Sequence, residues 1–464
     1  MQVSILSGIY SNMAAQYRVA YPRNLMPVAE ENGISKGYLK TVDGIDSYGT
    51  GAGVDRGGML WDGTLYRVMG SKLVSVADDG TVSELGEVGP GAQISIDYSF
   101  DKLAIASNGR LYYWNGTLTQ VTDPDLGNVV DMLWADGFFV TTDGTFIVVT
   151  ELNDPLAVDP LKYGSSEYDP DPVKGLIKLS GEIYVGNRYT IEVFQNRGGA
   201  GFPYQRIDGA LISRGFVGTH CKTLFADSFA FMGGARNEPC AIWLAASGGS
   251  SKLSTSEIDR VIAQYSEAEL SACLLETRKY DGHELLYVHL PNETWVYDAT
   301  TSIALGVPIW FSLHSAIDAT GAYRARNFVY AYNQWICGDT QSSALGKVFS
   351  EPTQFGSMVG WQFDTTLLYN ASKGAIVNSL ELVALTGRSP TGRNPQIFAS
   401  WTHDGLTWSN ERATSAGQRG DYLKRIVWRM LGMFRNWRGL RFRGADDAMV
   451  SFSRLEAELE PLNA

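Results

Sequence analysis

The residues with the clearest potential for chemistry are the histidines and acids of residues 283–289, which read HELLYVH. A zinc peptidase places two histidines and a glutamate on one helix as HExxH, but His283 and His289 are six residues apart in a strand-like run. That spacing puts both side chains on one face of a strand, about 20 Å apart. One metal ion cannot contact both, so we interpret both histidines as structural residues with hydrogen-bond partners.

A second candidate is the turn at residues 402–408, THDGLTW, which is one residue shorter than the Asp box of sialidase propellers and occurs once. We predict a plain hairpin there. A glycoside hydrolase needs two carboxylates about 5–10 Å apart, and nothing in the sequence selects such a pair from its 50 acidic residues. A P-loop, a GxSxG motif and a GxGxxG motif after a strand are absent from the sequence. The sequence therefore predicts no catalytic residues, no cofactor and no metal, so we expect the chain not to be an enzyme.

A basic cluster near the C-terminus is the strongest chemical anomaly. Residues 419–443 contain eight basic residues and a single acid, Asp421. Such a cluster can meet DNA phosphate or an acidic face of a neighbouring protein, or it can be a solvated strand face balanced by acids from elsewhere. Tryptophans interleave with the arginines, which suits a protein interface. The candidate interface residues are Arg425, Arg429, Arg435, Arg438, Arg441, Arg443, Trp428 and Trp437.

The elements that must position these residues are short strands joined by Asp-Gly and Asn-Gly turns. Examples are Asp62-Gly63, Asn108-Gly109 and Asp136-Gly137. These dipeptides supply the positive φ of tight hairpins. The units recur about every 40 residues, within the range of four-stranded propeller blades. We therefore predict an all-β chain with a β-propeller-like domain of six or seven blade-like units; a pair of β-sandwiches is the rival architecture.

The predicted domains follow from changes in this pattern. Residues 1–55 are expected to form an N-terminal docking arm and a first strand, and residues 56–354 the propeller-like domain, with a short helical insertion near 254–275. Ser254 with Glu257, and Ser266 with Glu269, each match a capping box in that insertion. Residues 151–175, rich in Asp and Pro, predict a long surface loop.

Residues 355–464 predict a C-terminal, sandwich-like β domain with separate strands. Its run GLRFRG alternates, so we expect Leu440 and Phe442 to point inward and Arg441 and Arg443 outward.

Composition constrains the environment. The 464 residues are 44% hydrophobic and 12% aromatic with 50 glycines, which favours an all-β chain with a sizeable core. A net charge of −12 makes a poor nucleic-acid clamp but suits a conduit that DNA passes without sticking. Neither a signal peptide nor a bilayer-spanning run is visible. The scattered cysteines are expected to be buried free thiols: Cys221, Cys240, Cys273 and Cys337.

Several segments carry a family resemblance in collinear order. They are SKGYLKTVDGI at 35–45, Arg56-Gly57, Tyr66–Val68, the stretch 218–298 and Cys337–Asp339. In residues 218–298, the most specific of them, strand-like runs flank two capped helices and a hairpin follows. With the arginine-rich C-terminal strands, these segments resemble the packaged-DNA stabilisation family, the tail hubs or nozzles of P22-like podoviruses.

The resemblance implies a structural virion protein of a short-tailed phage, assembled in the host cytoplasm. It implies a homohexameric ring below the portal–adaptor, which retains packaged DNA, extends the ejection channel, and anchors the tail needle and the tailspikes or fibres. Genomic double-stranded DNA would pass through the lumen without specific binding, and no membrane insertion is expected. The family has no known catalytic residues. The alternative is a β-propeller tail module that binds or cleaves glycans.

Overall fold

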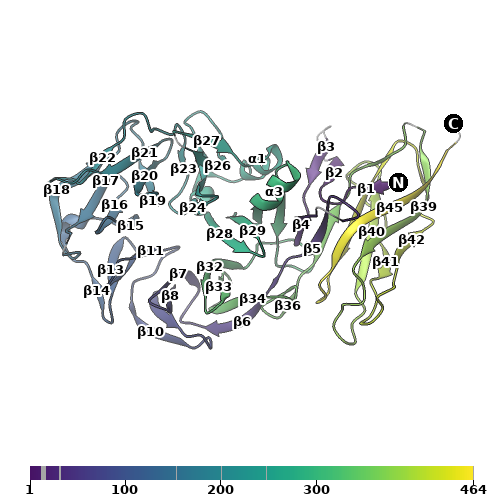
Figure 1. Cartoon of the computed structure of the whole chain (residues 1–464), viewed down its shortest axis with the longest axis horizontal. Coiled ribbons are helices and arrows are strands. Elements are labelled where there is room, and N and C mark those ends of the chain that lie inside the picture. The colour runs from purple at the N-terminus through teal and green to yellow at the C-terminus, as the bar shows by residue number, and fades with distance from the viewer. Residues whose placement is uncertain are drawn as a thin grey trace.

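The computed structural model describes residues 1–11, 17–30, 33–152, 154–199, 201–246, 248–371 and 373–462. It shows a β-propeller and a β-sandwich side by side along the longest axis of the molecule (Figure 1). The all-β prediction with a C-terminal sandwich is confirmed. Among the described residues, every helix is too short or too polar to span a lipid bilayer.

In the described part of the chain, seven sheets form the blades of the propeller, and their strands are antiparallel except for one parallel pairing between β6 (Gly44–Thr50) and β35 (Thr353–Gln354). Seven is the higher of the two predicted numbers. Blade 1 comprises β7 (Asp55–Trp61), β8 (Thr64–Met69), β9 (Lys72–Val76) and β10 (Val82–Glu87). Blade 2 comprises β11 (Ser95–Tyr98), β12 (Leu103–Ser107), β13 (Arg110–Trp114) and β14 (Leu118–Gln120). Blade 3 comprises β15 (Asp131–Ala135), β16 (Phe138–Thr142), β17 (Phe146–Thr150) and β18 (Val158–Ser165). A short 3₁₀ turn, η1 (Pro124–Leu126), joins blades 2 and 3.

The next four blades complete the ring. Blade 4 comprises β19 (Val173–Leu179), β20 (Glu182–Asn187), β21 (Ile191–Asn196) and β22 (Tyr204–Arg206). Blade 5 comprises β23 (Gly215–Phe216), β24 (Lys222–Phe225), β25 (Ser228–Gly234), β26 (Ala241–Ala246) and β27 (Gly249–Lys252). Blade 6 comprises β28 (Leu274–Tyr280), β29 (His283–His289), β30 (Thr294–Asp298) and β31 (Trp310–Leu313). Blade 7 comprises β32 (Ala325–Ala331), β33 (Gln334–Asp339), β34 (Ala344–Phe349), β6 (Gly44–Thr50), β35 (Thr353–Gln354) and β36 (Ser357–Met358).

Tight hairpins connect the strands within blades, as their sequences predict. Asp62 and Gly63 have φ of 46° and 73°, and Asn108 and Gly109 have φ of 52° and 71°. These left-handed values give the turn a twist that matches the paired strands. The Asp-Gly and Asn-Gly dipeptides therefore mark real turns between β7 and β8 and between β12 and β13.

Strand β6 closes the ring from the N-terminal side of the sequence. It pairs antiparallel with β34, with Ile45 opposite Val348 and Lys347 opposite Asp46. A hydrophobic cluster lies between each pair of neighbouring blades, and one of these joins blades 7 and 1 through residues such as Ile336 and Leu65. The propeller core is therefore a circle of interblade clusters rather than one central core.

The sandwich is built from both ends of the chain. One sheet has the order β4 (Leu25–Ala29), β5 (Gly37–Thr41), β45 (Ser451–Pro461), β39 (Ala375–Ala384) and β42 (Ile426–Arg429). In addition, β1 (Gln2–Val3) pairs with β45, and β43 (Met433–Phe434) pairs with β39. The other sheet has the order β37 (Trp361–Asp364), β44 (Trp437–Gly444), β40 (Gln396–Thr402) and β41 (Arg412–Ser415), and β38 (Leu368–Tyr369) also pairs with β44. The stacked rings of Phe363 and Phe442 lie 5.1 Å apart in the core between them.

The hairpin β4–β5 joins the two domains because each of its faces is buried in a different core. Leu25 and Leu39 belong to the sandwich core, whereas Met26 and Val28 belong to a propeller cluster with Leu285. Residues 1–55, separated as an arm by the sequence analysis, thus contribute strands to both domains, together with the hairpin β2 (Gly8–Ser11) and β3 (Tyr17–Ala20). The domain bounds at 55 and 354 stay a prediction.

Two local predictions need correction. The helices α1 (Ser256–Ile262) and α2 (Glu267–Ser271) lie near residues 254–275, but the N-cap of α1 is Thr255, without a side-chain cap bond. Ser254 instead donates to Asp259 and accepts from the amide of Ile242, so the capping box predicted at Ser254 is wrong. The box at Ser266 and Glu269 is confirmed.

The second correction concerns residues 151–175, which are not one continuous loop. They contain β18, the outer strand of blade 3. Pro160 is compatible with this strand because an edge strand needs ladder donors on one side only.

Candidate assembly surface

The basic cluster divides between two parts of the sandwich. Arg425 precedes β42 and Arg429 ends it, and β42 is the edge strand of its sheet. The facing edge strand, β41, closes this side of the sandwich, since Trp428 Nε1 donates to the carbonyl oxygen of Arg412 at 2.8 Å. Arg412 Nη1 donates in turn to the carbonyl oxygens of Arg429 and Met430 at 3.1 and 3.0 Å. Arg425 and Arg429 are both exposed on this edge.

Large apolar side chains accompany these arginines. Leu423 is 95% exposed and Met430 is 81% exposed, and Tyr422 and Met433 are also exposed. Strands β42 and β43 both pair with β39, Arg429 opposite Ser379 and Met433 opposite Ile376, so these residues follow one edge. We define the assembly surface as Tyr422, Leu423, Arg425, Arg429, Met430 and Met433. Arginine, tyrosine and methionine are enriched in protein interfaces.

Arg438 and Trp428 lie beneath this surface rather than on it. Arg438 is 1% exposed, and it donates to the carbonyl oxygens of Leu431 at 2.8 Å and Met433 at 2.7 Å. Its guanidinium also lies over the ring of Trp401, and burial lowers the pKa of Arg438 to about 10. Arg438 therefore holds the backbone that presents Met433.

The remaining members face other parts of the fold. Arg441 makes a bidentate ion pair with Asp364 at 2.7 and 2.8 Å and lines a cavity of about 320 Å³ between the sandwich, β3 and α1. Arg443 pairs with Glu411. The ring of Trp437 contacts that of Tyr17 edge-on at 6.1 Å. Leu440 and Phe442 point inward as predicted.

Acids from distant strands thus balance much of the cluster. Besides Asp364 and Glu411, Glu381 on β39 accepts from Arg425 Nε at 2.7 Å. The observation that Asp421 alone opposes the cluster holds for the sequence but not for the fold, because strands pair residues that are far apart in the chain. Arg435 follows β43 and is exposed. Whether the exposed members form an interface stays a prediction.

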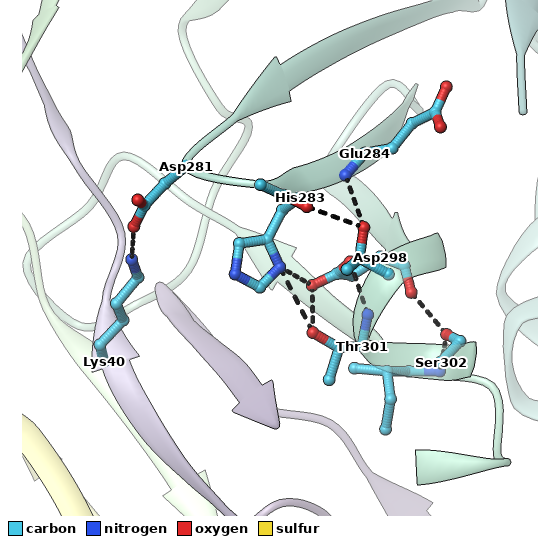
Figure 2. Close-up of polar contacts among 10 residues, drawn as sticks. Lys40, Asp281, His283, Glu284, Asp298, Thr301 and Ser302 are labelled. Atoms are coloured by element: carbon cyan, nitrogen blue, oxygen red, sulfur yellow. Dashed lines mark hydrogen bonds and ion pairs between the residues drawn. The ribbon is translucent and has the colours of Figure 1, made fainter. Parts of the chain in front are cut away.

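The histidines of β29 have separate partners, which fits a structural role. His283 Nδ1 lies 2.7 Å from Asp298 Oδ2, and Asp298 also accepts from the amide and hydroxyl of Thr301 at 3.1 and 2.6 Å (Figure 2). Asp298 is therefore the N-cap of α3 (Ala299–Leu305), with His283 as a further donor. Ser302 closes the same turn by donating to the carbonyl oxygen of Asp298 at 2.6 Å.

The other histidine of this strand is fully buried. His289 lies 2.6 Å from Glu276 and 3.0 Å from Thr294, and burial lowers the pKa of its imidazole. No group of three or more metal-ligand side chains occurs within the described ranges.

The turn at residues 402–408 is a local hydrogen-bonded structure. Asp404 accepts from the amides of Leu406 and Thr407, both at 2.8 Å, and from the Thr407 hydroxyl at 2.6 Å. These donors, the Thr407 hydroxyl foremost, hold the pKa of Asp404 well below its usual range. Asp404 thus fixes its own turn, in agreement with the predicted hairpin.

Sequence reasoning missed the apolar half of the assembly surface. Leu423 and Met430 are each next to a basic residue in the sequence. An apolar residue in that position looks like an ordinary member of a strand and not like part of an exposed surface. A signal was nevertheless present, because Tyr422 and Leu423 follow Gly420-Asp421, a turn sequence that places them outside a strand.

Comparison with known proteins follows the two domains. A family model described as bacteriophage P22 Gp10, beta-propeller, matches residues 1–352, and its beta-sandwich counterpart matches residues 360–460. The tail hub protein gp10 of Salmonella phage P22 is 29% identical over 483 residues, covering 99% of each chain.

Among solved structures, the Pan2 WD40 domain of Neurospora crassa covers 66% of this chain and 95% of its own, at 10% identity and a TM-score of 0.40. PorZ of Porphyromonas gingivalis covers 80% of this chain and 46% of its own, at 11% identity and a TM-score of 0.40. The two family models together span both domains, and on that ground the chain belongs to the bacteriophage P22 Gp10 family.

Proposed function

We propose that this protein is the tail hub of a short-tailed bacteriophage, with a structural rather than an enzymatic role. The single observation that carries the proposal is the end-to-end similarity to the tail hub protein gp10 of Salmonella phage P22, over 99% of both chains. The propeller and sandwich models of the family match in this order along the chain, and the alignment covers 99% of the relative.

In finer detail, six copies would form a ring below the portal–adaptor in the virion, after assembly in the host cytoplasm. The ring would retain packaged DNA, extend the ejection channel, and anchor the tail needle and the tailspikes or fibres. The net charge of −12 per chain supports a lumen that repels phosphate, so that genomic double-stranded DNA passes without specific binding.

The assembly surface is a candidate contact between copies in this ring. It lies on the sandwich, at the end of the molecule opposite β18 (Figure 1). The segment around β18 has the complementary character: Asp154 and Glu167 are exposed there, with Leu161 85% exposed and Tyr168 also exposed. Two different patches that meet head to tail generate a ring when the rotation closes.

The decisive experiment mixes the purified chain with the portal–adaptor assembly of the same phage and images the product by electron microscopy. A sixfold ring of added density at the distal end of the adaptor is expected. A chain that stays free and instead binds or cleaves host polysaccharide would overturn the hub proposal.

A matched pair of variants tests the surface separately from the function. Arg429→Glu combined with Met430→Asp should prevent ring formation, because it places acids against the acidic segment of the next copy. Lys279→Glu, at an exposed cation of the propeller, is the control and should assemble normally. If the double variant also forms the ring, the hub role stands and the assignment of this surface fails.

A further inference from the structure

A cavity of about 530 Å³ lies on the axis of the propeller, at the end where the inner strands begin. Residues at or just before the starts of β7, β11, β24, β28 and β32 line it, so most blades contribute to one site. Figure 1 shows these five strands around the centre of the propeller. The polar lining includes Arg56, Gln93, Thr219, His220 and Arg326. Its volume lies within the usual range of small-molecule sites, about 300–1,000 Å³.

The first unusual feature of this cavity is the charge of Arg56. Its guanidinium donates to the carbonyl oxygens of Gly70, Gly89 and Ala92 at 2.5–2.8 Å, and to the hydroxyl of Ser107 at 2.8 Å. Each of these partners is neutral. The hydrogen bonds fix the side chain, but its positive charge meets no carboxylate among the described residues.

Arg326 is the second cation, and its guanidinium has N–H groups without hydrogen-bond partners in the described ranges. Its Nε is buried and lacks a hydrogen-bond partner, and its guanidinium makes no ion pair within the described part of the chain. The nearby carboxylate of Glu276 is occupied by His289 at 2.6 Å and by the amides of Asn327 and Phe328. The guanidinium makes no hydrogen bond within the described residues, so its Nη groups are available to donate to a ligand in the cavity.

The other titratable groups of the cavity do not neutralise these arginines. Asp55 is bound by Arg67 through two bonds of 2.7 Å and also accepts from Asn327 Nδ2 at 2.8 Å. His220 contributes no charge at neutral pH, because burial and the Lys222 ammonium lower its pKa to about 4. The cavity is therefore a cationic site inside an acidic protein.

We propose that this axial cavity binds a compact multivalent oxyanion, with the Arg326 guanidinium as its principal ligand. The planar fork of arginine matches two oxygens of a phosphate or carboxylate, and Arg56 adds a fixed positive charge. The hydroxyl of Thr219, in the same lining, can donate a further hydrogen bond. The proposal is independent of the tail-hub function.

The test measures binding to the full chain by isothermal titration calorimetry, with pyrophosphate and citrate as probes at matched ionic strength. We expect at least one probe to bind with a Kd below about 1 mM and to raise the Tm of the protein. Pyrophosphate alone would assign the phosphate class, and citrate alone the polycarboxylate class. If neither probe binds in this range, the proposal is wrong.

Variants locate the site. Arg326→Gln should weaken binding about tenfold or more, because it removes the charge and the fork. Arg326→Lys keeps the charge but loses the fork, so it should bind with intermediate affinity and serves if the first variant fails to fold. Arg110→Gln, at an exposed arginine outside the cavity, is the control. Wild-type affinity in both Arg326 variants would overturn the assignment.

Discussion

Among single residues, Asp298 is a position in blade 6 where several polar contacts meet. Its side chain is fully buried and accepts from His283, from the Thr301 amide and from the Thr301 hydroxyl. We predict that Asp298→Ala lowers the free energy of unfolding by about 3 kcal/mol, since it removes an N-cap and leaves buried donors without partners. Urea denaturation followed by fluorescence measures this.

The matched control for this prediction is Asp208→Ala. The side chain of Asp208 is 96% exposed, and its contact with Arg206 is long, at 3.9 Å. Its loss should change the free energy of unfolding by less than about 0.5 kcal/mol. Equal effects of the two variants would contradict the role assigned to Asp298.

The buried histidine His314 predicts a pH dependence. Its Nδ1 donates to the carbonyl oxygen of Gly321 and its Nε2 accepts from Ser312, both at 2.9 Å, and burial lowers its pKa from 6.5 to about 4. Between these values the unfolded chain binds the proton and the folded chain does not. The stability that His314 contributes is therefore complete above pH 6.5 and is lost as the pH falls toward 4.

The measurement compares the wild type with His314→Gln by urea denaturation between pH 7 and pH 4.5. The wild type should lose stability more steeply, by up to about 1.4 kcal/mol per pH unit from this residue. Parallel curves for the two proteins would refute the prediction, because other titrating groups such as His220 are common to both.

At the scale of elements, the hairpin β4–β5 determines how the two domains are held together. Leu39 is completely buried in the sandwich core, opposite Phe452 on β45. Leu39→Ala should cost about 2–5 kcal/mol of unfolding free energy through the lost apolar contacts and the cavity. Leu161→Ala, at an exposed leucine of β18, is the control and should cost less than about 0.5 kcal/mol.

The same measurement tests whether the domains unfold together. Since β4–β5 is buried in both cores, the Leu39→Ala chain should still unfold in one transition, at lower urea, with near-UV circular dichroism and fluorescence coinciding. Two separated transitions would show that the hairpin does not couple the domains.

At the scale of the whole molecule, the closure of the ring depends on one strand from the N-terminal region. Ile45 on β6 is 1% exposed and belongs to the cluster between blades 6 and 7. Ile45→Ala should destabilise the protein by about 2–5 kcal/mol and raise hydrogen exchange of the β34 amides, because β34 is the ladder partner of β6.

The control on the same blade is Tyr330→Ala, at an exposed tyrosine of β32. It should leave both the stability and the exchange of β34 nearly unchanged. If Ile45→Ala lowers the stability without faster hydrogen exchange of the β34 amides, then Ile45 does not act by holding β6 in the last blade.

The class of fold and many local features could be predicted from the sequence alone. Asp62-Gly63 and Asn108-Gly109 predicted their hairpins because both residues of such a dipeptide readily adopt the positive φ that a tight hairpin turn needs, as they do here. The alternation of Leu440 and Phe442 with two arginines predicted the inward face of β44, since the period of a strand is two. Such features depend on neighbours within a few residues, so they can be read without the fold.

The partners of residues far apart in the chain could not be predicted from the sequence and become visible in the fold. The pairing of Arg441 with Asp364, the burial of Arg438, and the insertion of β6 into the last blade all join segments that no local pattern connects. The double burial of β4–β5 and the cationic cavity on the propeller axis arise in the same way. The burial of Arg438 and the charge balance of Arg441 depend on strands that are far apart in the sequence, so no local pattern of residues specifies them.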